Sequence, residues 1–215
     1  NNLLILSLFL ILSLGISHGA LDHLKGKKLL KILNYKSISL FYFFYVLIGI
    51  SIILLWLLFP QFLLLVFLIT ASYHFGKEDS EFIKNKSNFD LFYFFKTSIA
   101  ITAPLLFHKT DTLNIFENLN FYVSQSIFIS NEFIYIMIVI SLFANIFISL
   151  NNQIEIKSLL LMDFLSILIL NYFLSPILAF TIYFCFLHSI RHAFKLSSEL
   201  NKKNIIKGFH LFAIK

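Results

Sequence analysis

The sequence predicts an all-α fold, a polytopic membrane-spanning helical bundle with about seven transmembrane helices and a truncated eighth. Three observations predict this: hydrophobic residues make up 59% of the 215-residue chain, charged residues only 13%, and the mean hydropathy is +0.86. Ordinary soluble domains carry about 25% charged residues. The net charge of +6 comes from lysines in short clusters between apolar runs, which is typical of membrane proteins, so we expect no nucleic-acid partner.

A window of about 19 residues separates the individual apolar spans. They cover residues 2–18, 38–59, 61–75, 91–107, 133–150, 158–175 and 176–194, and an eighth begins near residue 205. The first span lacks the basic start and the small-residue cleavage site of a signal peptide, which favours a transmembrane helix. Pro60 and Pro176 fall where one span gives way to the next, and proline is tolerated in the first turn of a helix, so both are predicted to begin helices.

The ends of the sequence predict a single domain over residues 1–215 that is a fragment lacking its C-terminal part. The chain begins with Asn1 rather than Met, and it ends at Lys215. The last apolar segment has run for only about 10 residues at that point, whereas a membrane-spanning helix needs about 20.

Lysines concentrate in every second loop between the predicted spans. These loops carry Lys25, Lys27, Lys28, Lys31 and Lys36, then Lys77, Lys84 and Lys86, then Lys157, and finally Lys195, Lys202, Lys203 and Lys207. The other loops contribute only Lys109. Because basic loops stay in the cytoplasm, we expect a multi-pass protein of the inner plasma membrane with its N-terminus outside. Lys96, near the start of the fourth span, is expected to snorkel back to the cytoplasmic side.

Histidines gather at one level of this predicted topology. The cytoplasmic ends of three spans carry His18 and His23, His74, and His188 with His192, whereas His108 lies at the outer end of the fourth span and His210 in the unfinished eighth. Ionisable residues at membrane depth are costly and usually functional. The single cysteine, Cys185, excludes a disulfide and a cysteine-based metal site, so any soft-metal chemistry falls to histidine.

His188 and His192 project from one face of a helix, because residues four apart differ by only about 40° around its axis. The pair can bind one cation, and its convergence with the other histidines favours a metal centre over two histidines that merely contact loops or lipid headgroups. We take His18 as a further ligand and Asp22, four residues later, as an orienting acceptor. His23 points elsewhere and either lines the pocket or lies at headgroup level.

Four motifs in the same order carry a family resemblance. They are GISHGALDHLKG at 15–26, SYHFGKEDSEF at 72–82, APLLFH at 103–108 and YFCFLHSIRHAFK at 183–195. Together they resemble the Brp/Blh family of bacterial β-carotene 15,15′-dioxygenases, from the first predicted helix to the seventh. The resemblance implies a membrane enzyme that binds Fe(2+) and uses O₂ to split the central double bond of β-carotene into two retinal molecules. A retinal-using rhodopsin is the implied physiological consumer.

The resemblance also assigns residues. Carried over by motif, the iron ligands would be His18, His74, His188 and His192, and no catalytic residue is expected beyond them. Neighbours in the second shell or pocket would be Asp22, His23, Asp79, Arg191, Tyr73 and Phe184. We expect Arg191 to pair with Asp22 or Asp79 or to reach lipid headgroups, and Glu78 to lie on a solvated loop face.

Asp163, within the sixth predicted span, is expected to need a partner such as the N–H of a metal ligand, because an unpaired carboxylate is costly at that depth.

The residues alone leave two rival functions open. A membrane di-iron desaturase or hydroxylase normally needs about eight histidines, including adjacent pairs, whereas five share a level here. A non-enzymatic haem-binding or metal-binding membrane protein needs histidines that face one another in mid-membrane.

Overall fold

The computed structural model describes residues 2–15, 22–35, 37–80, 90–122, 130–150, 154–201 and 204–214, and these residues form helices without a single strand. The prediction of an all-α fold is confirmed. The helices are α1 (Asn2–Gly15), α2 (Asp22–Ile32), α3 (Ile38–Leu58), α4 (Pro60–Glu78), α5 (Asp90–Thr97), α6 (Ile99–Phe107), α7 (Lys109–Asn118), α8 (Asn131–Leu150), α9 (Ile154–Phe173), α10 (Pro176–Ile182), the π-helix η3 (Tyr183–Ser189), α11 (Ile190–Leu200) and α12 (Ile205–Ile214).

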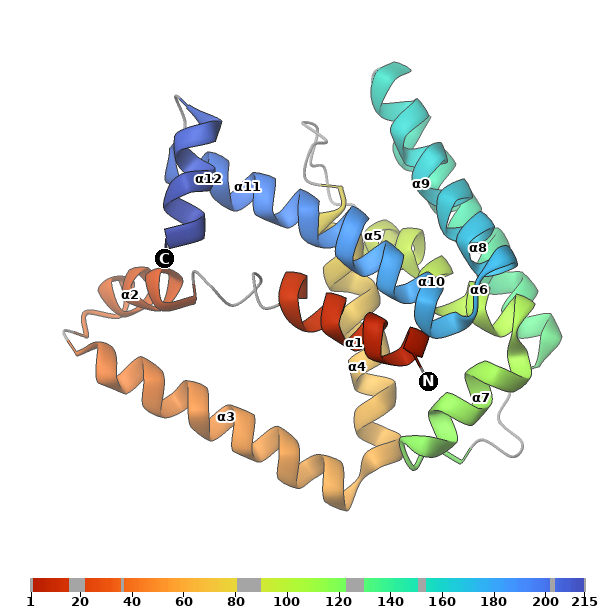
Figure 1. The fold of residues 1–215 in the computed structure, drawn as a ribbon, viewed down its shortest axis with the longest axis horizontal. Coiled ribbons are helices and arrows are strands. Elements are labelled where there is room, and N and C mark those ends of the chain that lie inside the picture. The colour runs from red at the N-terminus through yellow and green to blue at the C-terminus, as the bar shows by residue number, and fades with distance from the viewer. Residues whose placement is uncertain are drawn as a thin grey trace.

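Both predicted proline starts are confirmed. Pro60 opens α4 after the single residue Phe59, and Pro176 opens α10 after a two-residue turn. Proline suits the first turn because the N–H it lacks has no partner within the helix there. The result is a sharp change of direction between α3 and α4 and between α9 and α10, visible in Figure 1.

Helix α4 lies at the centre of the arrangement (Figure 1) and packs against α3, α5 and α6. On one side α5, α6, α8 and α9 pack against one another, and on the other α1 lies along α10 and η3. Helices α2 and α3 form an arm that extends away from this group in Figure 1. The chain thus brings α4 close to the continuous rod made of α10, η3 and α11.

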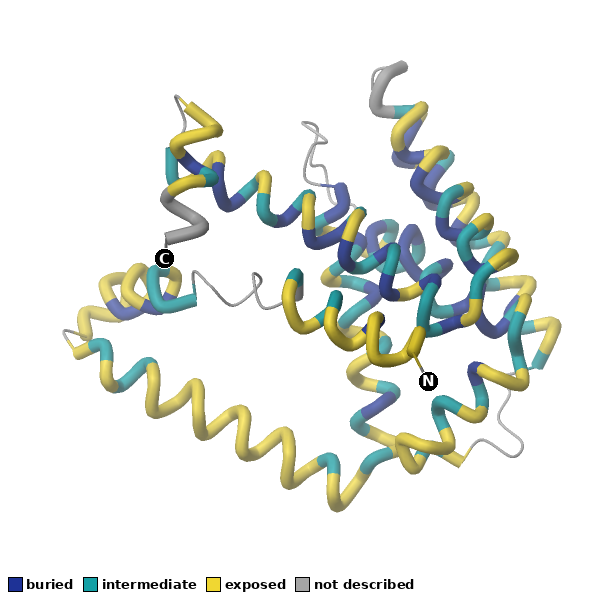
Figure 2. The backbone as a smooth tube through the Cα atoms, in the orientation of Figure 1, coloured by how far each residue is buried: buried dark blue, intermediate teal, exposed yellow. Residues whose placement is uncertain are grey.

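The buried core connects this rod to the rest of the bundle. Ile99 and Ala103 of α6, Phe164 and Ile167 of α9, and Tyr183 of η3 form one buried cluster. Figure 2 shows the buried residues gathered in these helices, whereas α3 is exposed along nearly its whole length. Because Tyr183 belongs to this cluster, the core packs η3 against α6 and α9.

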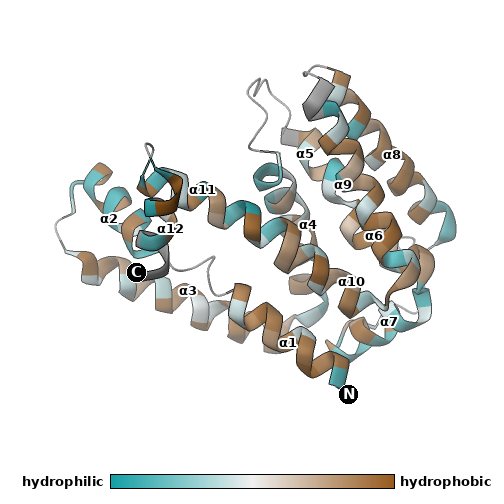
Figure 3. Ribbon diagram, turned by 45° about the horizontal axis from the view of Figure 1, so that its top comes forward, coloured by the Kyte–Doolittle hydropathy of each residue, from teal (hydrophilic) through white to brown (hydrophobic). Residues whose placement is uncertain are grey.

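The prediction of seven spans is not confirmed. Among the described residues, three helices are long and apolar enough to cross a membrane, namely Ile38–Leu58, Asn131–Leu150 and the rod Pro176–Leu200. A fourth is obtained if Leu91–Phe107 and Lys109–Asn118, which meet at an angle of 108°, count as one broken span. Figure 3 shows hydrophobic residues over much of α1, α3 and α8, and hydrophilic residues mainly on short helices such as α2.

Two short helices occur where loops were expected. Helix α2 has Asp22 in its first turn and Lys31 in its last, and α7 has Asp111 in its first turn. An acid near the N-terminus and a base near the C-terminus favour a helix through its dipole. A hydropathy profile does not detect such helices, because it finds long apolar stretches and does not measure the local stability of a helix.

The π-helix η3 was likewise not expected. It interrupts the rod at Tyr183–Ser189 and contains His188. A π-helix occurs mostly as a single widened turn, often at a functional site, because the distortion costs stability. The widened turn marks this part of the rod as the place to look for a site.

Gly76 allows α4 and α5 to approach closely. A Cβ atom at this position would lie 1.9 Å from the Tyr93 carbonyl oxygen and 2.7 Å from Thr97 Oγ1. The obstructing atoms belong mainly to the backbone of α5, so they cannot swing aside. Only glycine permits this distance between the two helices.

Replacing Gly76 with alanine should therefore force α4 and α5 apart and lower the free energy of unfolding by about 1–3 kcal/mol, as for other overpacked sites. Gly49→Ala is the matched control, because a Cβ atom there meets nothing within 4 Å. Thermal unfolding of the detergent-solubilised protein should show a lower midpoint for Gly76→Ala alone. Equal midpoints would contradict the close approach.

Candidate metal centre

Four side chains from two helices face one another at the end of α4. His74 and Glu78 lie four residues apart on α4, and His188 and His192 lie four residues apart on η3 and α11. Each pair occupies one face of its helix. The rings of His74 and His188 are 5.6 Å apart between centroids, at an angle of 69°.

Adjacent carboxylates at the end of α4 hold both histidines of the rod. Asp79 Oδ1 lies 2.9 Å from Nδ1 of His188, and Glu78 Oε2 contacts Nδ1 of His192. A carboxylate only accepts hydrogen bonds, so Nδ1 carries the proton in each ring. Nε2 is then the nitrogen that can bind a metal, and it is buried in both rings.

The charge states of the two carboxylates suit this role. Burial alone would raise the pKa of Glu78, but the hydrogen bond from His192 and the nearby charges of His192, Lys195 and His74 lower it to about 2. Burial likewise opposes ionisation of Asp79, but His188, Lys96 and Tyr183 outweigh it and lower its pKa. Both groups are thus carboxylates at neutral pH.

Donor atoms close enough to share one ion come from His74, Glu78 and His188, and lie within 4.8 Å of one another. Two imidazoles with one carboxylate match the ligands that hold non-haem iron in oxygenases. Glu78 also has protein partners, since its Oε1 lies 3.5 Å from Lys195 Nζ and its Oε2 contacts His192. The donor set fits a divalent transition metal with imidazole as its main ligand.

Two aromatic rings contact His188 of the candidate metal centre, whereas His74 is exposed. The centroid of Phe75 lies 4.4 Å from that of His188, and Phe184 stacks on His188 at 5.8 Å with an angle of 24°. Phe184 therefore lies beside His188, and its role in a pocket stays a prediction. Tyr73 has a different neighbour, because its hydroxyl accepts a hydrogen bond from Lys77 at 3.2 Å.

A layer of buried charge lies next to the histidines. Arg191 donates two hydrogen bonds of 2.7 Å to the Asp163 carboxylate, and Lys96 Nζ lies 4.0 Å from the same carboxylate. Tyr183 donates to Asp79 at 2.8 Å. Both Lys96 and Asp163 are buried, so this layer joins α5, α9 and α11 behind the metal centre.

The charged layer corrects three expectations. Lys96 was expected to snorkel to the membrane surface, but it is 5% exposed and near Asp163. Arg191 was expected to pair with Asp22 or Asp79, but it pairs with Asp163, whose own expected partner was a metal ligand. Two nearby cations stabilise the buried Asp163 carboxylate better than a single imidazole N–H would.

Glu78 corrects a fourth expectation, since it is half-buried and holds His192 instead of lying on a solvated loop. The sequence contains a signal for it, because Glu78 follows His74 by four residues, the same spacing that singled out His188 and His192. The π-helix had no comparable signal.

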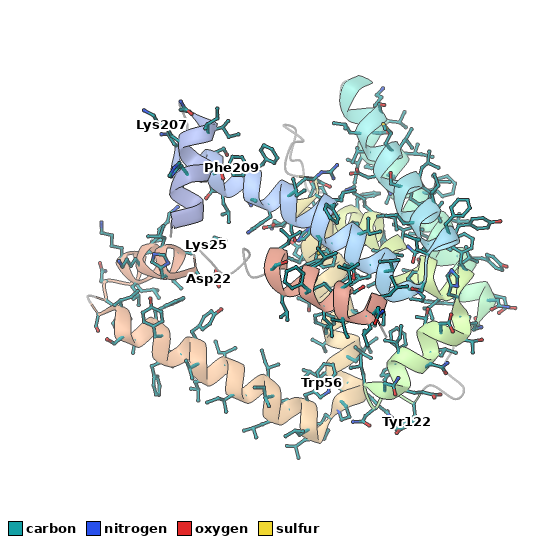
Figure 4. All side chains as sticks on the ribbon, in the orientation of Figure 1. Asp22, Lys25, Trp56, Tyr122, Lys207 and Phe209 are labelled. Carbon is teal, nitrogen blue, oxygen red and sulfur yellow. The ribbon has the colours of Figure 1, made fainter. Side chains whose placement is uncertain are left out.

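The remaining predicted residues are His18, Asp22, His23 and His210. His18 falls outside the described residues, so its place as a ligand stays a prediction. Asp22 and the half-buried His23 are on α2, where Asp22 accepts a hydrogen bond of 3.2 Å from Tyr45 of α3. Figure 4 labels Asp22 on the side of α2, apart from the rod. His210 is exposed on α12.

Two comparisons with known proteins point to the same family. A family model described as beta-carotene 15,15'-dioxygenase matches residues 9–215. A beta-carotene 15,15'-dioxygenase from uncultured marine bacterium 66A03 is 24% identical over 212 residues, which cover 94% of this chain and 74% of the relative. No solved structure matches the chain.

Replacing Asp79 with asparagine should weaken metal binding about 10- to 100-fold, because the Nδ1–H of His188 loses its carboxylate acceptor. Asp111→Asn, an exposed change on α7, is the control and should bind as the wild type does. The measurement is a titration of the metal-stripped protein with Fe²⁺ against a chelator of known affinity. Equal affinities would show that Asp79 does not orient the ligand.

Replacing Asp163 with alanine should lower the free energy of unfolding by about 3–5 kcal/mol, because the buried Lys96 and the partly buried Arg191 then lose this carboxylate. Asp111→Ala should change it little, since exposed substitutions usually have small effects. Denaturant unfolding in detergent measures both. A cost for Asp163→Ala no larger than that of the control would mean that water reaches the charged layer.

Proposed function

The chain belongs to the beta-carotene 15,15'-dioxygenase family, and from this membership we propose that it cleaves the central 15,15′ double bond of β-carotene with O₂ to give two molecules of retinal. It is an oxidoreductase enzyme. The single observation that carries the proposal is that His74 and His188 can share one ion, while His188 and His192 of the rod are each held by a carboxylate at the end of α4.

The proposed metal is Fe²⁺, with His18, His74, His188 and His192 as ligands. His188 and His192 support this set because they are held alike, each with Nδ1 on a carboxylate and Nε2 buried. Asp79 and Glu78 are then the residues that orient them. When bound, iron supplies the redox chemistry by which O₂ reacts with the alkene.

The overall reaction balances with one O₂. The double bond between the two central carbons breaks, and each carbon takes one oxygen atom to become an aldehyde. The alkene supplies the electrons that reduce O₂, so no other reductant is needed. Neither a general acid nor a general base is required, which agrees with carboxylates at the site that are already engaged with histidines.

The chain's own residues then have three tasks. Asp79 and Glu78 keep the protons of His188 and His192 on Nδ1, so Nε2 stays available. The rings of Phe75 and Phe184 present flat apolar surfaces beside His188. These rings also exclude water from the reacting carbons, which limits side reactions.

The cellular setting follows from the apolar helices and the lysine-rich loops. The substrate is a hydrocarbon that dissolves in the bilayer, so it reaches the enzyme from the surrounding lipid. We place the protein in the inner plasma membrane, with the metal centre near the cytoplasmic face. Its product suits a retinal-using rhodopsin in the same membrane.

The two rival functions have less support. The donor groups found among the described residues amount to one metal centre, whereas a desaturase of the di-iron type requires two irons. A haem carrier would need two histidines on opposite faces of the porphyrin, whereas His188 and His192 lie four residues apart on one side of the same rod.

Expression of the gene in a bacterium that makes β-carotene should bleach the orange colour and produce retinal, as measured by chromatography of cell extracts. His188→Ala and His192→Ala should each abolish retinal formation, because each removes a ligand. His210→Ala is the control and should keep it, since His210 is exposed on α12. Full activity of both site variants would refute the proposed centre.

A further inference from the structure

An apolar cavity of about 200 Å³ lies between α4, α6, α7 and α10. Its wall includes Phe67 and Ala71 of α4, Ala100 of α6 and Phe180 of α10. Among the described residues that line it, Thr112 carries the single hydroxyl, which donates to the His108 carbonyl at 2.8 Å. The wall thus offers a ligand no open polar group.

Two routes of aromatic rings connect this cavity to the metal centre. Phe75 lines the cavity and its ring centroid lies 4.4 Å from that of His188. Phe180 also lines it, and Phe180, Phe184 and His188 follow in a column, with centroids 5.6 Å and 5.8 Å apart and angles of only 12° and 24°. A flat apolar molecule in the cavity would therefore extend along rings as far as His188.

A second apolar cavity, of about 330 Å³, adjoins the first. It lies among α4, α5, α6, α7 and α8, and it shares the wall residues Leu68, Ile101 and Phe116 with the first. Its volume alone falls in the range of about 300–1,000 Å³ that is usual for small-molecule sites. The two together form one apolar space, and its wall residue Phe75 contacts the ring of His188.

The rim of this space carries exposed apolar side chains. Phe67 is 57% exposed and Phe180 38% exposed, and Ile69 at the second cavity is 49% exposed. In a bilayer, exposed apolar side chains of this kind contact lipid tails. A hydrocarbon can therefore enter from the lipid without crossing water.

We propose that these two cavities hold one half of the carotenoid, with its cyclic end in the larger cavity and its polyene chain along Phe180 and Phe184, so that the central double bond lies at His188. The inference rests on the proposed function, because it assigns the binding site of that reaction. It adds a place for the substrate that is separate from the metal ligands, and it makes Ala71 a determinant of substrate length.

The test compares Ala71→Phe, which fills the smaller cavity, with Thr70→Phe, which adds the same ring at the neighbouring exposed position. The chelator-treated proteins are incubated with β-carotene in detergent, and the pigment that stays bound is measured by its visible absorption. We expect at least tenfold less bound pigment for Ala71→Phe and the wild-type amount for Thr70→Phe. Iron binding by the stripped protein should be the same in both variants.

A shortened substrate separates blocking of the cavity from damage to the metal centre. An apocarotenal that lacks one cyclic end and part of the chain needs less room, so Ala71→Phe should cleave it within about threefold of the wild-type rate while its KM for β-carotene rises at least tenfold. If both substrates suffer equally, the change acts on the metal centre and the cavity proposal is wrong. If Ala71→Phe does not fold, as judged by its elution profile, Ala100→Leu on the opposite wall gives the same comparison.

The outcomes distinguish a failure of the proposed function from a failure of the cavity proposal. If the wild-type protein neither binds nor cleaves β-carotene, the proposed function fails. If the wild type cleaves it and Ala71→Phe binds and cleaves it equally well, the function stands and the cavity proposal is overturned.

Discussion

The structure depends on the contact between the two carboxylates that end α4 and the two histidines of the rod. Glu78 and Asp79 are adjacent in sequence, so they diverge from the end of the helix and reach histidines one turn apart, His192 and His188. Charge-assisted hydrogen bonds of this kind are about twice as strong as neutral ones. The same contact joins α4 to the rod, and it determines which ring nitrogen of each histidine can bind a metal.

The buried charges behind this contact make its geometry hard to change. Asp79 accepts from Tyr183 as well as from His188. Lys96 Nζ lies 4.0 Å from the Asp163 carboxylate, and it lines one small cavity together with Asp79 and Asp163. Arg191, only one residue before His192, is fixed to Asp163 of α9 by two hydrogen bonds. A buried network is costly to break at any one member, so α4, α5, α9 and α11 hold the histidines from several directions.

Sequence patterns predicted the parts of this arrangement that depend on short-range spacing. Composition predicted a helical membrane protein, the prolines predicted two helix starts, and the spacing of His188 and His192 predicted that the two rings lie on one side of their helix, where Asp79 and Glu78 contact them. Patterns did not predict that Lys96 is buried, because the partner that makes burial tolerable, Asp163, is 67 positions away in the chain. Nor did hydropathy predict the number of spans, since α5 and α6 are short and α7 turns back at 108°.

The π-helix explains how one rod serves both the metal centre and the cavity. In a regular α-helix, residues four apart advance by about 40° past a full turn, so a column of three such side chains curls around the axis. A π-helical turn takes more than four residues, so residues four apart there stop just short of a full turn. Phe184 and His188 lie in η3 and Phe180 in α10, and the opposite rotations offset one another. The three side chains therefore project from one side of the rod, and their rings stack from the cavity wall to the histidine that faces Asp79.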